Sequence, residues 1–175
     1  MKTITILKKI ITAYYYLAIF GFLFLTIGFP IIFSIKKNKV SLEEPIELNF
    51  MDMNIDVSNM GLGAFIAIIV IGAIILFPFL KGIYLFKKSL HDLSNGNYFS
   101  DLVVTNFKKI GVCFLIFGFG QWIFKIAVQL IFVNDLKLGI DNTLFLSSIL
   151  GLFFLFLSEA FAKAKETKQE NDLTI

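Results

Sequence analysis

The stretch that decides the fold is Ile10–Ile35, IITAYYYLAIFGFLFLTIGFPIIFSI, which carries no charge between Lys9 and Lys36. Its 26 residues exceed the ~20 apolar residues that an α-helix needs to cross a bilayer. The stretch ends in Ser34, Ile35 and two lysines, without the small-residue cleavage motif of a signal peptide. We therefore expect it to stay in the protein as a membrane anchor.

Three further apolar stretches follow in a chain of 175 residues that is 57% hydrophobic. These stretches predict an all-α, polytopic membrane protein with four transmembrane helices in a compact bundle, folded as one domain over residues 1–175. The short connections leave no room for a separate soluble domain. We expect spans at 10–35, 57–80, 110–133 and 143–161, joined by an outer loop (36–56) and a cytoplasmic hairpin (81–109) and followed by a cytoplasmic tail (162–175).

The lysines predict the orientation of the spans, because cytoplasmic loops of membrane proteins carry an excess of basic residues. Eleven lysines lie in the N-terminus, the hairpin and the tail, whereas four lie in the two outer connections. Lys36, Lys37 and Lys39 are a local exception on the outer side. We expect both termini in the cytoplasm and the chain in the inner (cytoplasmic) membrane.

The outer loop contains two short alternating patterns. Ile46, Leu48 and Phe50 alternate with polar residues, and Met51 starts a second alternation in the opposite phase. This pattern favours two very short strands with a bend near Phe50–Met51 that could cap the outer end of the bundle; an irregular loop is the alternative.

Two positions of the first span are expected to shape its packing. Pro30 should bend its outer third, because proline lacks the N–H that continues an α-helix. Gly21 and Gly28 are seven residues apart, on one helix face, where a second helix could approach closely.

The second and third helices are expected to continue into the cytoplasm as an amphipathic hairpin. Helical spacing of apolar residues persists beyond Lys81, the run Ser94–Asn97 is typical of a helix end and turn, and Ser100 is a candidate N-cap. The apolar stripe of this hairpin either packs against the bundle or forms a docking surface. The candidate docking residues in the hairpin are Leu90, Leu93, Tyr98 and Phe99.

A polar seam interrupts the third span. Gln121, Lys125 and Gln129 are four residues apart and share one helix face. Polar groups inside a bilayer are costly unless they are paired, so such a seam favours either a water-filled ion path or a packed stripe of interhelical hydrogen bonds. No acid inside the spans lies deep enough to form a proton relay with Lys125.

Composition excludes several other functions. All 16 basic residues are Lys, which argues against specific phosphate or nucleic-acid recognition, because that chemistry favours the Arg fork. The single Cys113 cannot form an internal disulfide. The chain contains no nucleotide-binding, zinc-protease or serine-hydrolase motif. We therefore expect no catalytic residues, no metal and no cofactor, and partners that include membrane lipids.

The C-terminal end carries the most specific pattern. The last apolar helix ends in Glu159-Ala160-Phe161, a charged stretch follows, and the chain closes with Glu170-Asn171-Asp172-Leu173-Thr174-Ile175. Together with the inner-loop run Gly96-Asn97-Tyr98-Phe99, this end resembles a family of small bacterial four-helix membrane proteins known as a domain of unknown function. The family often has a Pro before the Phe of this loop, where this chain has Tyr98.

The resemblance implies a partner, because members of that family are often encoded beside a small Cro/CI-type helix-turn-helix repressor. We expect a non-enzymatic regulator or anchor for such a protein, with Asp172, Leu173 and Ile175 as candidate docking residues. A tail that frays or folds back onto the hairpin is the structural alternative. The alternative function is a small transporter or channel subunit that uses the polar seam.

Overall fold

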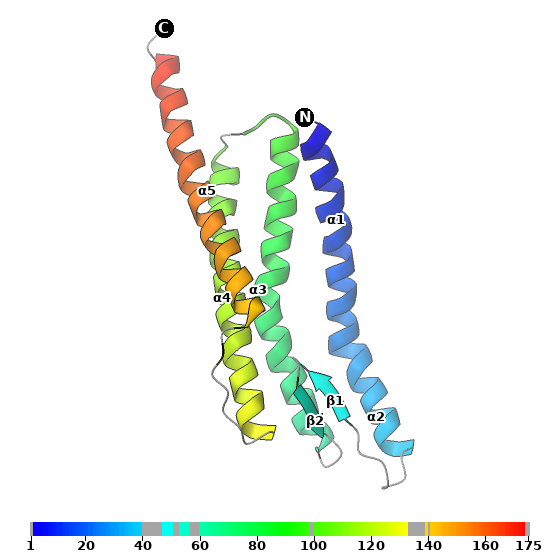
Figure 1. Ribbon diagram of the computed structural model, residues 1–175. Helices are drawn as coiled ribbons and strands as arrows, with labels where there is room; N and C mark the ends of the chain where they lie inside the picture. Colours follow the sequence, from blue (N-terminus) through cyan, green and yellow to red (C-terminus); the bar gives the residue numbers. More distant parts are fainter. Residues whose placement is uncertain are drawn as a thin grey trace.

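The computed structural model describes residues 2–39, 47–50, 53–56, 60–98, 100–132, 139 and 141–173. The protein is an all-α four-helix bundle, as the sequence predicts (Figure 1). Its helices are α1 (Lys2–Leu23), a π-helix (Phe24–Gly28), α2 (Phe29–Lys39), α3 (Leu62–Ser94), α4 (Asp101–Phe132) and α5 (Asn142–Leu173).

The first span consists of α1, the π-helix and α2. The predicted bend at Pro30 takes the form of the π-helix directly before it. Pro30 has no N–H to donate to the carbonyl four residues earlier, and the N–H of Phe29 reaches back to Phe24 O instead. The wider turn of the π-helix, with bonds between residues five apart, accommodates the missing N–H of Pro30, so the span continues as a helix to Lys39.

Two short strands form in the outer connection. β1 (Glu47–Phe50) and β2 (Met53–Asp56) pair in antiparallel register, with Phe50 opposite Met53 and Glu47 opposite Asp56. These strands match the two alternating patterns in the sequence. Strand β2 contacts α4, while a role as a cap stays a prediction.

The turn between α3 and α4 has the chemistry that the sequence predicts. The N–H of Gly96 donates to Leu93 O and the N–H of Asn97 donates to Asp92 O, the bonding pattern of a Schellman C-cap. Gly96 has a φ of 87°, which favours glycine. Ser100 then caps α4, because its Oγ accepts from the N–H of Val103 at 3.2 Å.

The helices follow one another in chain order across the molecule. Helix α3 contacts the first span on one side and α4 on the other, and α4 packs along α5 (Figure 1). Among the described residues, no backbone contact joins the first span to α4 or α5. The first span therefore lies at the edge of the bundle, with its backbone next to α3.

The closest helix approach lies between α4 and α5. A Cβ at Gly111 would stand 2.7 Å from Gly151 O, and a Cβ at Gly118 would stand 2.7 Å from the Cβ of Ser147. Small residues thus let these two backbones pack directly. The sequence prediction of a close approach at Gly21 is wrong, since no atom of another helix lies within 4 Å of a Cβ at that position.

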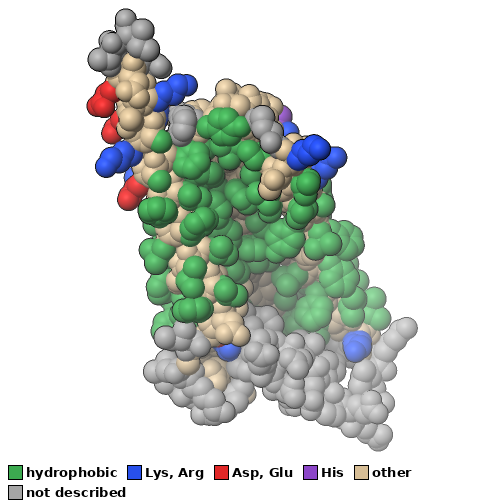
Figure 2. Space-filling view, turned by 45° about the horizontal axis from the view of Figure 1, so that its top comes forward, with side chains coloured by type: hydrophobic (Ala, Val, Ile, Leu, Met, Phe, Trp, Pro, Cys, Tyr) green, Lys and Arg blue, Asp and Glu red, His purple; other side chains and the backbone are tan. Residues whose placement is uncertain are grey.

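Apolar side chains cover the sides of the helices. Large hydrophobic residues such as Leu17, Phe20 and Ile74 are exposed. Figure 2 shows hydrophobic side chains over the face in view, with most of the charged ones near the end from which α5 projects. Apolar patches of this extent need a covering phase. The first span, α3, α4 and α5 are each long and apolar enough to cross a membrane.

Candidate functional site

The polar seam of α4 meets the start of α5. Gln121 and Lys125 are partly buried and Gln129 is buried. The Nζ of Lys125 lies 3.6 Å from Oδ2 of Asp141. The other carboxylate oxygen of Asp141 accepts from the N–H of Leu144 at 2.8 Å and so caps α5. Lys125 is therefore paired with a carboxylate and does not face lipid alone.

Sequence reasoning missed Asp141 as the partner of Lys125. Its signal was local: an Asp followed by Asn142 and Thr143 before an apolar run is a helix N-cap pattern. The pairing also depends on the register of α5 along α4, which places Asp141 beside Lys125. Trp122, one turn before Lys125, donates from Nε1 to Gly139 O at 3.0 Å and also ties α4 to this connection.

The hairpin stripe packs into the bundle. Leu90 and Leu93 are 3% and 8% exposed, in a core cluster with Val103, Phe107 and Ile110. Tyr98 is partly buried against the same cluster. The docking interpretation of Leu90 and Leu93 is thus wrong, because a partner cannot contact side chains that the core already covers, and the packing alternative holds.

The remaining docking residues lie at the chain end and in the turn. Phe99 and Ile175 fall outside the described residues. Asp172 and Leu173 belong to α5 by their backbone, but their side chains are not described. The backbone of the tail is therefore helical through Leu173.

Helix α5 projects past the rest of the bundle (Figure 1). Lys165 pairs with Asp101 in the first turn of α4 at 2.5 Å, and Ser158 Oγ donates to Val104 O at 2.9 Å. The eight residues after Lys165 extend α5 by about 12 Å beyond the Lys165–Asp101 ion pair, at ~1.5 Å per residue. The extension presents exposed side chains from Glu166 to Asn171.

The first span is fastened to α3 near its N-terminal end. The Nζ of Lys8 lies 2.8 Å from Nδ1 of His91 and donates to Ser94 Oγ at 3.3 Å. The Nζ of Lys87 lies 4.9 Å and 4.7 Å from the ring centroids of Tyr15 and Tyr16, within cation–π range. These contacts bring the N-terminus and the hairpin to the same end of the protein.

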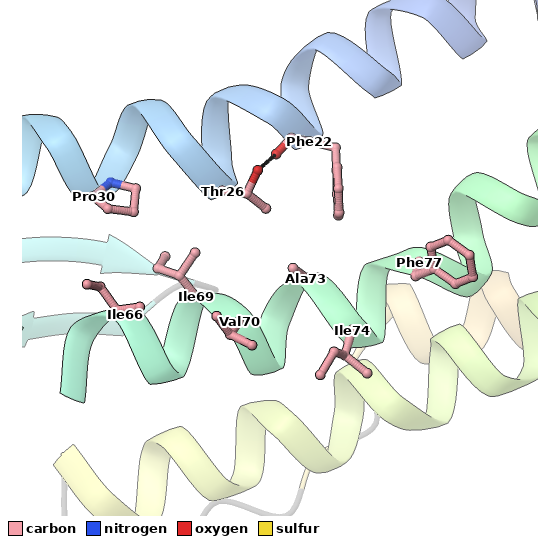
Figure 3. A pocket seen from close by; sticks show the side chains of 9 residues that line it. All are labelled: Phe22, Thr26, Pro30, Ile66, Ile69, Val70, Ala73, Ile74 and Phe77. Carbon is pink, nitrogen blue, oxygen red and sulfur yellow. Dashed lines mark hydrogen bonds between the residues drawn. The ribbon is translucent and has the colours of Figure 1, made fainter. Parts of the chain in front are cut away.

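Near the other end, the first span and α3 meet through aromatic rings and enclose a groove. Phe33 stacks on Phe65 with ring centroids 3.9 Å apart. Next to this contact lies an apolar groove of about 360 Å³, lined by Thr26 and Pro30 of the first span and by Val70 and Ala73 of α3 (Figure 3). The only hydroxyl among its lining residues, that of Thr26, donates to Phe22 O at 2.9 Å.

Among the described residues, no cluster of three His, Cys, Asp or Glu side chains could hold a metal ion. The apolar groove between the first span and α3 is not lined by Gln121, Lys125 or Gln129.

The fold and these contacts define a small multi-pass membrane protein whose four apolar helices share one bundle. A comparison with known families then gives its relationship. Residues 10–175 match the family described as protein of unknown function (DUF2975), and the chain belongs to that family. Neither the curated proteins nor the solved structures contain a significant match.

Proposed function

We propose that this membrane protein is a non-enzymatic regulator or anchor that holds a cytoplasmic protein at the bacterial inner membrane. The observation that carries the proposal is the projection of α5, which continues as a charged helix to Leu173, past its ion pair with Asp101 of α4 at Lys165. The part of α5 after Lys165 exposes its side chains from Glu166 to Asn171. It suits the recognition of a second protein.

Because the apolar stripe of the hairpin is buried, we assign partner binding to α5. With Leu90 and Leu93 inside the core and Tyr98 packed against it, the candidate docking residues of the C-terminal segment Glu170–Ile175 carry the proposal. Glu170 and Asp172 give this segment negative charge. Acidic groups at an interface steer a basic partner toward it and raise the rate of association.

We propose a small helix-turn-helix repressor as the partner, as the family resemblance implies. Such a protein carries a basic surface for DNA. An acidic helix that binds this surface would compete with DNA and keep the repressor at the membrane. In this proposal the chain itself does not contact nucleic acid.

Crosslinking in intact membranes tests the proposal. The tagged wild-type chain is expected to recover a small helix-turn-helix protein, whereas Asp172→Lys or Leu173→Asp lowers its recovery about tenfold, the effect of losing one interface hot spot. Glu166→Lys is the matched control, because it makes the same charge change on the same helical extension, outside the proposed docking segment.

Two results would contradict the proposal. One is unchanged recovery of the partner with Asp172→Lys and Leu173→Asp. The other is an equal loss of partner recovery with Glu166→Lys. That result would show that the partner responds to the overall charge of the helix and not to the docking segment. Membrane accumulation of each variant, measured by immunoblot, separates loss of binding from loss of protein.

A transporter or channel subunit is the second candidate, and the buried seam of α4 is the observation behind it. The pairing of Lys125 with Asp141 gives this lysine a structural role and favours the regulator. If Lys125→Met abolished ion or solute flux in proteoliposomes that contain the folded protein, the transporter would be favoured instead.

A further inference from the structure

The turn between α3 and α4 and the base of the α5 extension enclose a polar hollow of about 380 Å³. Asn97, Tyr98 and Ser100 line it from the turn, and Lys165, Lys168 and Gln169 line it from α5. Hydroxyl-bearing, amide and lysine side chains thus line the same hollow. This hollow is distinct from the polar seam and from the docking segment at the chain end.

The charges of the hollow favour an anion. Lys165 and Lys168 are three residues apart and share a face of α5. Lys165 pairs with Asp101, whose side chain is 87% exposed, so water screens that pair. Lys168 has no ion-pair partner among the described side chains. The sum of two lysines and one aspartate leaves one positive charge at the hollow.

A phosphate group fits these donors. Lysine binds phosphate as a point charge, whereas arginine binds it as a bidentate fork. Recognition here would therefore depend on charge together with the Ser100 hydroxyl and the side-chain amides of Asn97 and Gln169. The all-lysine composition argues against arginine-type phosphate recognition, but it leaves this mode open.

The position of the hollow brings two sources of phosphate within reach. Lys165 and Gln169 lie four and eight residues beyond Phe161, the last large apolar residue of the α5 span. At ~1.5 Å per helical residue, Lys165 and Gln169 lie about 6 Å and about 12 Å along the helix from Phe161. The headgroup layer is roughly 5–7 Å thick, so Lys165 lies within it and Gln169 lies just beyond it. A lipid headgroup and a soluble phosphate compound can both reach this height.

We propose that this hollow is a binding site for a phosphate group, supplied by an anionic lipid headgroup or by a soluble phosphate compound. The site does not depend on the proposed protein partner, since it uses neither Asp172 nor Leu173. Its occupation would join the α3–α4 turn to α5 through the ligand, in addition to the Lys165–Asp101 pair.

Two probes distinguish the sources. For the soluble source, inorganic pyrophosphate is titrated calorimetrically into the full-length protein in neutral detergent micelles. For the lipid source, the protein is placed in nanodiscs of phosphatidylcholine alone or of an equal mixture with phosphatidylglycerol, and the shift in its unfolding temperature is measured. Binding or stabilisation that weakens with added salt is expected in at least one arm.

Lys168→Gln is the test variant and Lys163→Gln is the matched control. Both remove one positive charge from the C-terminal part of α5, but Lys163 is exposed and lies outside the hollow. We expect Lys168→Gln to weaken pyrophosphate binding about tenfold, the effect of one charge-assisted hydrogen bond, or to abolish the phosphatidylglycerol shift. Lys163→Gln should change either readout less than about twofold, and Lys168→Arg should retain it.

Removing the competing carboxylate provides an independent check. Asp101→Asn is expected to tighten binding, because it frees Lys165 and removes the negative charge at the rim. The proposal is overturned if the wild-type protein neither binds pyrophosphate nor gains stability from phosphatidylglycerol. It is also overturned if Lys163→Gln and Lys168→Gln weaken the response by the same factor. Weaker binding by a folded Asp101→Asn chain would also contradict it. Circular dichroism confirms the fold of each variant.

Discussion

Lys125 and Asp141 form the ion pair that joins the polar seam of α4 to the start of α5, with 3.6 Å between Nζ and Oδ2. The same carboxylate caps α5 through the N–H of Leu144. One side chain therefore neutralises an ammonium near the bilayer and satisfies a helix end. Each task alone would be modest, but Asp141 removes two unsatisfied groups at once.

The two tasks of Asp141 can be separated by substitution. Asp141→Ala should lower the free energy of unfolding by about 1–2 kcal/mol, because it removes both the cap and the partner of Lys125. Asp141→Ser should lose less, since its hydroxyl can still cap α5. Lys125→Met should lose less still, because the cap stays intact. Denaturant unfolding in detergent micelles measures the three values. Equal losses for Asp141→Ala and Asp141→Ser would refute the capping role.

The helices and their ends were predictable because local chemistry determines them. Uncharged stretches of sufficient length predict spans, and the sequence at Gly96 and Ser100 predicts the turn that the backbone adopts. The bend before Pro30 was predictable for the same reason, since the missing N–H is a property of proline itself.

The faces on which the helices pack were not predictable from the sequence. Lipid and protein interior are both apolar, so a helix that is hydrophobic all round gives no signal of the face that packs. Gly21 and Gly111 look alike in the sequence, yet only Gly111 contacts another helix closely. The Lys125–Asp141 pair, and the burial of Leu90 in place of docking, likewise depend on helix packing and register.

Gly111 and Gly21 give a matched pair for testing the close approach of α4 and α5. Gly111→Ala should destabilise the protein by about 1–3 kcal/mol, because its Cβ would stand 2.7 Å from Gly151 O. Gly21→Ala, where a Cβ meets nothing within 4 Å, should be neutral or stabilise α1 by about 0.5–1 kcal/mol. Thermal unfolding in micelles compares them. A Gly111→Ala protein as stable as Gly21→Ala would rule out the close contact.

We expect the side chain of Asn106 to lower the free energy of unfolding. Its side chain is 6% exposed, and its Nδ2 has no hydrogen-bond partner in the part of the chain that the structure describes. Asn106→Leu keeps the number and branching of the side-chain heavy atoms and removes the unpaired donor, so it should raise the free energy of unfolding by about 1–3 kcal/mol. Ser89→Ala is a suitable control, because the buried hydroxyl of Ser89 already bonds to Leu85 O, at 3.0 Å, within its own helix. A less stable Asn106→Leu protein would show that the amide is required where it stands.

The orientation of the chain is the last prediction. The N-terminus, the hairpin and the α5 extension lie at one end of the protein, where Lys8 contacts His91 and Lys165 contacts Asp101. These three segments hold eleven lysines, and the outer connections hold four. Because basic segments stay on the cytoplasmic side, this end should face the cytoplasm.

Topology reporters check the orientation directly. Green fluorescent protein fused after Ile175 should fluoresce, since it folds in the cytoplasm, and alkaline phosphatase at the same position should be inactive. Alkaline phosphatase inserted within residues 40–56 should be active, since it needs an oxidising compartment for its disulfides. The local cluster Lys36, Lys37 and Lys39 opposes this orientation, so replacing these lysines by Gln should leave the reporter pattern unchanged or sharpen it. An active phosphatase after Ile175 would place the α5 extension outside the cell and exclude a cytoplasmic partner.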